Sequence, residues 1–77
     1  MNRIITKHEL WNLPYEQITE FTKGQFVRIV LNTGEHIDDF VVRLLLAANP
    51  PNSFVGFMTS HKGNFYIREI EHVEVLL

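Results

Sequence analysis

QFVRIVLNTGEHIDDFVVRLL, residues 25–45, decides the fold that we expect for this chain. The apolar residues of its first half occupy alternate positions: Val27, Ile29 and Leu31. The run ends at Asn32-Thr33-Gly34, which fits a three-residue hairpin loop with Gly34 in the left-handed conformation, because glycine has no Cβ to clash there. The stretch therefore predicts two antiparallel strands around a tight turn.

The same loop fixes a register for the hairpin. It places Arg28 opposite Asp38, and the neighbouring pairs are Ile29 with Ile37 and Val30 with His36. Odd-numbered positions would then face the core, while the Arg28–Asp38 pair would face solvent.

The second half of the stretch departs from this pattern. Its even-numbered residues are more apolar than their odd neighbours: Phe40, Val42, Leu44 and Leu46. We predict a β-bulge or sharp bend at Asp39-Phe40 that turns the even set inward. The surplus apolar face would be covered by the N-terminal helix that carries Leu10 and Trp11, or by another chain.

The segment before the hairpin reads as helical over residues 6–22. Thr6 and Glu9 form a capping-box pattern, and Ile5 and Leu10 are spaced as a hydrophobic staple. Pro14 divides the segment into two short helices, because proline cannot donate a backbone N–H inside a helix.

Further strands are expected after the hairpin, separated by turns. Asn49-Pro50-Pro51-Asn52 ends the second strand. The remaining strands are expected at Phe54–Thr59, Phe65–Arg68 and 73–77, with a corner at residues 69–71. Gly56, in the middle of the third strand, predicts close packing or a bend.

These elements predict one domain, residues 1–77, that is mainly β with an N-terminal helix. The strands, residues 25–77, would form a small five-stranded antiparallel barrel that is strongly bent. The alternative is a two-layer α+β arrangement, with the helix lying on an open sheet.

Composition narrows the function classes. The chain has 77 residues, seven basic and nine acidic side chains, and a net charge of −2, which is not the electrostatic footprint of a dedicated nucleic-acid binder. It has no cysteine, so disulfides and thiolate zinc sites are excluded, and a reducing, cytoplasmic location is expected. Its longest apolar run is too short to span a bilayer, so no membrane partner is expected.

Two groups of residues resemble the Sm-like family. The first group is Gly24, Val27, Ile29, Leu31 and Gly34, and the second is Tyr66-Ile67-Arg68 followed by Val73 and Val75. The resemblance implies a helix followed by a bent five-stranded barrel. It also implies a ring in which the fourth strand of one subunit pairs with the fifth strand of the next.

The resemblance also implies an RNA pocket, with Asn49 and Arg68 at positions that match the family's loop motifs. Leu45 stands where the family has an aspartate, and Glu69 stands where it has a glycine. Lys62 and Tyr66 are added as a cation and a stacking group that suit single-stranded RNA.

Catalysis and metal binding have weaker patterns. No nucleophile and base can be placed together from spacing, so a non-enzymatic protein without cofactors is expected. His36 and Asp38 share a strand face, but a metal site needs three or four converging ligands, so no metal site is predicted.

The surplus apolar residues favour a non-catalytic assembly or interaction module. We expect a homo-oligomer, or a complex with a protein partner, formed through sheet edges or the apolar strand surface. The interface residues expected from this pattern are Phe40, Val42, Leu44, Leu46, Val73 and Val75. An oligomeric ring on single-stranded RNA is the alternative.

Overall fold

The computed structural model describes residues 2–47 and 53–76. A short strand, β1 (Arg3–Thr6), runs directly into helix α1 (Lys7–Asn12), and helix α2 (Tyr15–Thr22) follows. The later elements are β2 (Phe26–Leu31), β3 (His36–Ala47), β4 (Ser53–Thr59), β5 (Asn64–Tyr66), the 3₁₀ turn η1 (Ile67–Glu69) and β6 (Ile70–Val75). The protein is therefore mainly β with an N-terminal helical segment, as predicted.

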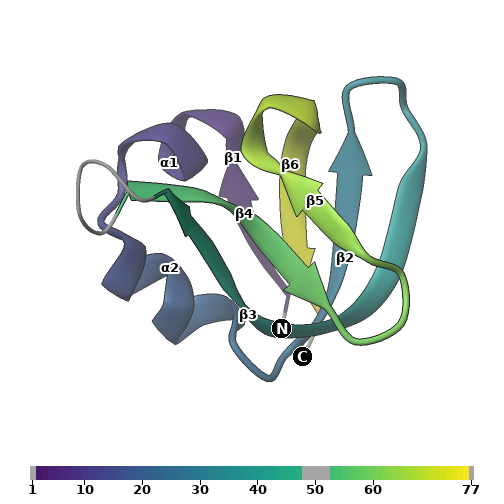
Figure 1. The fold of residues 1–77 in the computed structure, drawn as a ribbon. Helices are drawn as coiled ribbons and strands as arrows, with labels where there is room; N and C mark the ends of the chain where they lie inside the picture. The colour runs from purple at the N-terminus through teal and green to yellow at the C-terminus, as the bar shows by residue number, and fades with distance from the viewer. Residues whose placement is uncertain (1, 48–52, 77) are drawn as a thin grey trace.

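All six strands form one antiparallel sheet in the order β1-β6-β2-β3-β4-β5. β3 is long enough to serve both halves of this sheet: its first part pairs with β2 and its second part pairs with β4 (Figure 1). Within residues 2–47 and 53–76, no ladder joins β5 to β6 or to β1. The sheet is open, so the prediction of a closed five-stranded barrel was wrong.

The extra strand explains part of that difference. β1 pairs along the outer side of β6, with Arg3 opposite Val75 and Thr6 opposite His72. The guanidinium of Arg3 also lies 3.8 Å from the centre of the Phe21 ring on α2. β6 is therefore an interior strand, paired with β1 on one side and with β2 on the other. Four residues that pair with a segment almost seventy positions away leave no local signal.

The helical segment follows its sequence signals. The Glu9 backbone N–H donates to Thr6 Oγ1 at 3.2 Å, and the Thr6 backbone N–H donates to the Glu9 carboxylate at 3.0 Å. Ile5 and Leu10 are both buried, which agrees with a hydrophobic staple. The predicted capping box is confirmed.

The β2–β3 hairpin has the predicted register. Arg28 pairs with Asp38, Ile29 with Ile37, and Val30 with His36. Gly34 has φ of 92°, the left-handed geometry expected for this loop. Local alternation and one glycine were sufficient to fix this part of the fold.

The predicted inversion at Asp39-Phe40 was wrong. Asp39 and Val41 stay inward and are buried, so the alternation set by β2 continues past Asp39. Phe40 is 49% exposed and Val42 is 45% exposed. The register with β4 shifts between Val41 and Arg43 and again between Leu45 and Leu46, and the first of these bulges brings Leu44 into the core.

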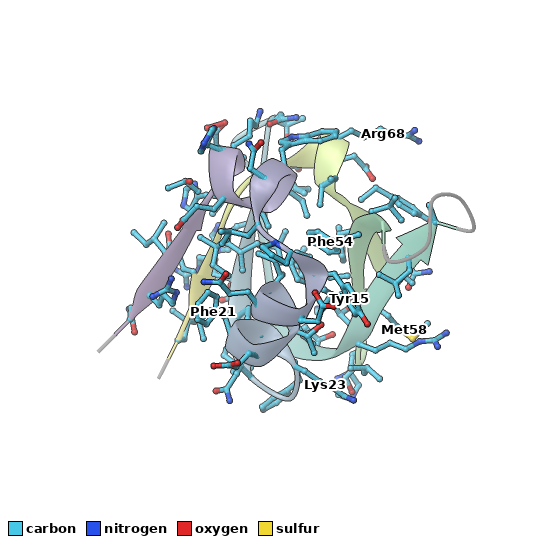
Figure 2. The ribbon with its side chains drawn as sticks, turned by 90° about the vertical axis from the view of Figure 1, so that its left-hand side faces the viewer. Tyr15, Phe21, Lys23, Phe54, Met58 and Arg68 are labelled. Atoms are coloured by element: carbon cyan, nitrogen blue, oxygen red, sulfur yellow. The ribbon has the colours of Figure 1, made fainter. Side chains whose placement is uncertain are left out.

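The core lies between the helices and the inner face of the sheet. Leu10 of α1 and Ile18 of α2 pack there against strand residues, and Phe54 of β4, labelled in Figure 2, packs against the same core. The buried apolar strand residues are Ile5, Val27, Ile29, Val41, Leu44, Phe57, Ile70, Val73 and Val75. Among the described residues, no helix has the length and apolar character needed to cross a bilayer.

Gly56 is a point of close strand contact, as its place in β4 predicted. A Cβ at this position would collide with the backbone carbonyl of Phe65 on β5. We expect Gly56→Ala to lower the free energy of unfolding by roughly 1–3 kcal/mol, because the neighbour is backbone and cannot turn away. Urea denaturation monitored by circular dichroism measures this change.

Asn64→Ala is the matched control for that variant. It changes an exposed residue of the strand that faces Gly56 and should alter the free energy of unfolding by less than about 0.5 kcal/mol. Equal stability of the Gly56→Ala variant and the wild type would contradict the close contact.

Candidate functional site

A cavity of about 450 Å³ opens where the end of α1 approaches β4 and η1. Its lining includes Trp11, Ala47, Phe54, Val55, Tyr66 and Arg68. In Figure 2 the Arg68 side chain extends outward at the top of the molecule, while Phe54 lies deeper. The volume is in the usual range for ligand sites, and the mixture of apolar walls with a few polar groups is typical of them.

The η1 turn holds Tyr66 and Arg68 beside this cavity. Asn32, in the β2–β3 loop, anchors the turn: its side-chain amide donates to the Arg68 carbonyl at 2.8 Å, and its backbone N–H donates to the Glu69 carbonyl at 2.9 Å. The Arg68 guanidinium lies 5.8 Å from the centre of the Tyr66 ring, within the range of a cation–π contact. The cation and the aromatic ring therefore lie in contact beside the cavity.

Trp11 enters the cavity from the last turn of α1. Leu10 fills the core side of this six-residue helix, so its neighbour Trp11 is left 57% exposed. The sequence reading assigned Trp11 to covering the sheet and missed its part in the cavity. The available signal was its position: residues 10 and 11 of one helix point about 100° apart and cannot both face the core.

The three predicted RNA-contacting residues that the structure describes do not gather at one place. Tyr66 and Arg68 meet at the cavity. Lys62 lies in the β4–β5 turn, at the opposite end of that hairpin, and Asn49 lies outside the described residues. The described residues therefore do not form a continuous basic surface that joins Lys62 to Arg68.

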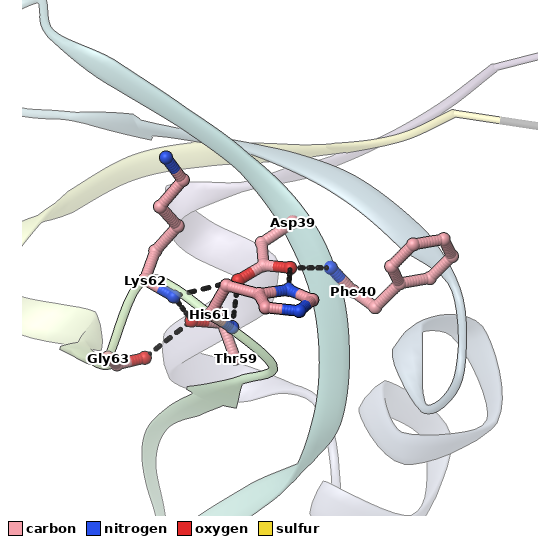
Figure 3. A network of polar contacts seen from close by, with 6 residues as sticks. All are labelled: Asp39, Phe40, Thr59, His61, Lys62 and Gly63. Carbon is pink, nitrogen blue, oxygen red and sulfur yellow. Dashed lines mark hydrogen bonds and ion pairs between the residues drawn. The ribbon is translucent and has the colours of Figure 1, made fainter.

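A second polar centre lies on β3, around the carboxylate of Asp39 (Figure 3). Three backbone N–H groups donate to it, from Phe40 at 2.7 Å, His61 at 2.5 Å and Lys62 at 2.8 Å. The His61 ring nitrogen Nδ1 lies 3.2 Å from Asp39 Oδ1. Thr59 closes the same turn, since its hydroxyl donates to the Gly63 carbonyl at 2.6 Å.

Opposing effects act on the pKa of Asp39. Burial disfavours the charged carboxylate and would raise the pKa, but the hydrogen bonds from His61, Phe40 and Lys62 outweigh it and hold the pKa far below its ordinary value. Asp39 therefore stays ionised inside the sheet. The sequence reading missed this role, although an acidic residue at an inward position of an alternating strand was a signal for it.

This centre has the arrangement of a turn anchor. His61 is an exposed histidine oriented by a carboxylate, as a general base would be. Among the described residues, however, no serine or threonine hydroxyl forms a hydrogen bond to the His61 ring. The network explains the position of the β4–β5 turn without requiring catalysis.

The weak metal pattern does not become a site. Asp38 uses both carboxylate oxygens on Arg28, with N–O distances of 2.9 and 3.1 Å. The hydrogen bond and charge of Arg28 also lower the pKa of Asp38. No group of three histidine or acidic side chains converges within residues 2–47 and 53–76.

A third feature is an apolar surface on the outer face of the sheet, which we call the outer strip: Phe26, Phe40 and Val42. The rings of Phe26 and Phe40 pack edge to face across β2 and β3, with centroids 5.0 Å apart. All three side chains are exposed, because both helices lie on the inner side of the sheet. The N-terminal helix therefore does not cover them.

The outer strip includes only part of the predicted interface. Phe40, Val42 and Leu46 are exposed and accessible to another chain. The other three predicted interface residues, Leu44, Val73 and Val75, are buried in the core, so assigning them to an interface was wrong. β6 turns these valines inward because it is an interior strand.

Comparison with known protein families, with curated proteins and with solved structures found no match for this chain.

The Asp39 network predicts a defined dependence of stability on pH. The folded-state pKa lies below the unfolded value of about 3.9, so the stabilisation is complete above that pH and is lost progressively as the pH falls below it. We expect the melting temperature of the wild type to fall on acidification from about pH 4. Asp39→Asn should melt at a lower temperature at pH 7 and show a smaller loss on acidification.

Thermal unfolding followed by circular dichroism between neutral and acidic pH measures both effects. Glu20→Gln, which removes an exposed carboxylate of α2, should melt as the wild type does at pH 7. Parallel acid profiles for the wild type and Asp39→Asn would mean that another group controls acid unfolding.

Proposed function

We propose that this protein is a non-catalytic assembly module that associates with copies of itself through the outer strip. The observation that carries the proposal is the exposed aromatic pair Phe26–Phe40, extended along β3 by Val42. A sheet face in contact with water normally carries polar side chains, and adjoining apolar ones mark an interface.

The edge strands of the sheet are poorly suited to pairing with another subunit, which favours the outer face of the sheet as the site of self-association. β1 has four residues and β5 has three, and such short edge strands resist pairing with other chains. Both edges also carry or adjoin cations, Arg3 and Lys7 on one side and Lys62 and Arg68 on the other. Like charges disfavour a direct β1–β5 contact between subunits.

A ring of the kind that the Sm-like resemblance implies faces a further obstacle. Its fifth strand would correspond to β6, whose outer side is already paired with β1. What supports a distant Sm-like relationship is the connectivity of β2 to β6, in which β2, β3, β4 and β5 pair in succession and β6 returns beside β2. The proposed assembly therefore retains that architecture and uses a different surface.

A stable interface needs more area than the outer strip provides, so neighbouring residues on the same face would take part in the contact. Specific complexes bury roughly 800 Å² on each partner, more than three partly exposed side chains provide. Arg28 and Asp38 form the next row on the same face, joined by their ion pair. They would form a polar rim beside the apolar centre.

Phe40→Ser tests the proposal. Removing an apolar ring from the centre of the contact should weaken self-association by about tenfold or more, because most of its burial energy is lost. Analytical ultracentrifugation over a concentration series gives the association constant. A wild type that stays monomeric throughout that series would disprove the assembly proposal.

Ile4→Ser is the matched control. Ile4 is exposed on β1, three strands away from β3 in the sheet, so its loss should leave the association constant unchanged. Equal weakening by both substitutions would point to a loss of fold rather than of the contact, and circular dichroism separates these cases.

Single-stranded RNA is the alternative ligand of such an assembly. Its support is the Tyr66–Arg68 pair beside the cavity, which offers a stacking ring and a cation. If RNA binds there, oligouridine should bind more weakly as salt rises, and Arg68→Ala should reduce both affinity and salt dependence. Fluorescence anisotropy of labelled oligouridine measures this, and no binding at low salt would rule the alternative out.

A further inference from the structure

The polar side chains that line the cavity are mainly hydrogen-bond donors. Its polar side-chain groups are the Trp11 indole N–H, the Tyr66 hydroxyl and the Arg68 guanidinium, all of which donate hydrogen bonds. Among the described residues that line it, none has a carboxylate or a side-chain amide. Within residues 2–47 and 53–76, neither the Trp11 indole nor the Arg68 guanidinium has a hydrogen-bond or ion-pair partner. In the described part of the lining the Tyr66 hydroxyl is the one side-chain acceptor, so the site offers more donors than acceptors.

The apolar part of the cavity consists largely of aromatic surface. Trp11 and Tyr66 are exposed at its rim, and Phe54 lies deeper, packed edge to face on the buried Phe57 at a centroid distance of 5.1 Å. Because Phe57 belongs to the core, this wall is fixed before any ligand arrives. A ligand would meet preformed rings.

We propose that this cavity binds a proline-rich segment of a protein partner in the polyproline II conformation, with an acidic side chain of that segment paired to Arg68. Proline has no backbone N–H, so such a segment presents carbonyl acceptors and apolar rings. This chemistry complements aromatic walls with donors. The carboxylate of the partner would supply the negative charge that pairs with the Arg68 guanidinium.

A nucleobase fits this donor set less well. The edges of bases carry both donors and acceptors, and the lining side chains that the structure describes offer only the Tyr66 hydroxyl as an acceptor. An oligoproline segment has no such donors to leave unpaired, and its conformation is largely ordered before binding, which reduces the entropic cost. The geometry therefore favours the proline-rich segment over RNA.

This inference is independent of the proposed assembly. The cavity shares no residue with the outer strip, which lies on β2 and β3. Loss of self-association in Phe40→Ser should leave peptide binding intact. The two proposals can therefore fail separately.

The first experiment titrates the full chain with an oligoproline peptide that carries a glutamate at each end. Trp11 is the only tryptophan, so its fluorescence and its single indole N–H resonance report on the cavity directly. We expect saturable binding with a downfield shift of that resonance. A peptide of equal length and charge, with glycine and serine in place of proline, should bind at least about tenfold more weakly.

Three substitutions remove the donors one at a time. Trp11→Phe, Tyr66→Phe and Arg68→Gln should each weaken binding by about fivefold to tenfold, the effect of one lost hydrogen bond or ion pair, as measured by calorimetry. Arg43→Gln, which removes an exposed cation of β3 outside this cavity, is the control and should bind as the wild type does.

Several results would overturn the proposal. No saturable response to the oligoproline peptide would exclude this ligand class, and equal binding of the glycine-serine peptide would show that proline is not recognised. A shift of the indole resonance by oligouridine but not by oligoproline would assign the cavity to RNA. Unchanged affinity in all three variants would place the peptide elsewhere on the surface.

Discussion

A charged carboxylate inside a small sheet has to be compensated, and Asp39 obtains its partners from a turn more than twenty residues later in the chain. The backbone N–H groups of His61 and Lys62 and the His61 ring reach it there, while Phe40 donates locally. This contact joins the first part of β3, which pairs with β2, to the β4–β5 turn. It also holds Asp39 inward, and so its neighbour Phe40 is directed outward.

The outward position of Phe40 has consequences along the rest of β3. Because the alternation continues through Val41, Phe40 and Val42 both face water, and the register with β4 first shifts at the bulge before Arg43. That bulge returns Leu44 to the core, where it packs with the buried side chains. The outer strip and the bulge before Arg43 therefore both follow from the inward position of Asp39 on β3.

The N-terminal segment completes the molecule in two ways. β1 pairs along β6 and makes that strand an interior one, and α1 presents Leu10 to the core and Trp11 to the surface. Trp11 then lies beside Tyr66 and Arg68, which are almost sixty residues away in sequence. The tertiary fold brings the α1 residue Trp11 next to η1. None of the segments that form this site is recognisable as a motif in the sequence.

The sequence by itself determined the features that depend on neighbouring residues: the Thr6–Glu9 capping box, the register around Gly34 and the tight position of Gly56. Each is set by backbone geometry or by contacts close along the chain. Only the tertiary structure decided that β1 covers β6, that the sheet stays open and that Asp39 faces inward. Those outcomes depend on hydrogen-bond partners from distant segments, and alternation of apolar residues cannot indicate that a buried charge will find its donors.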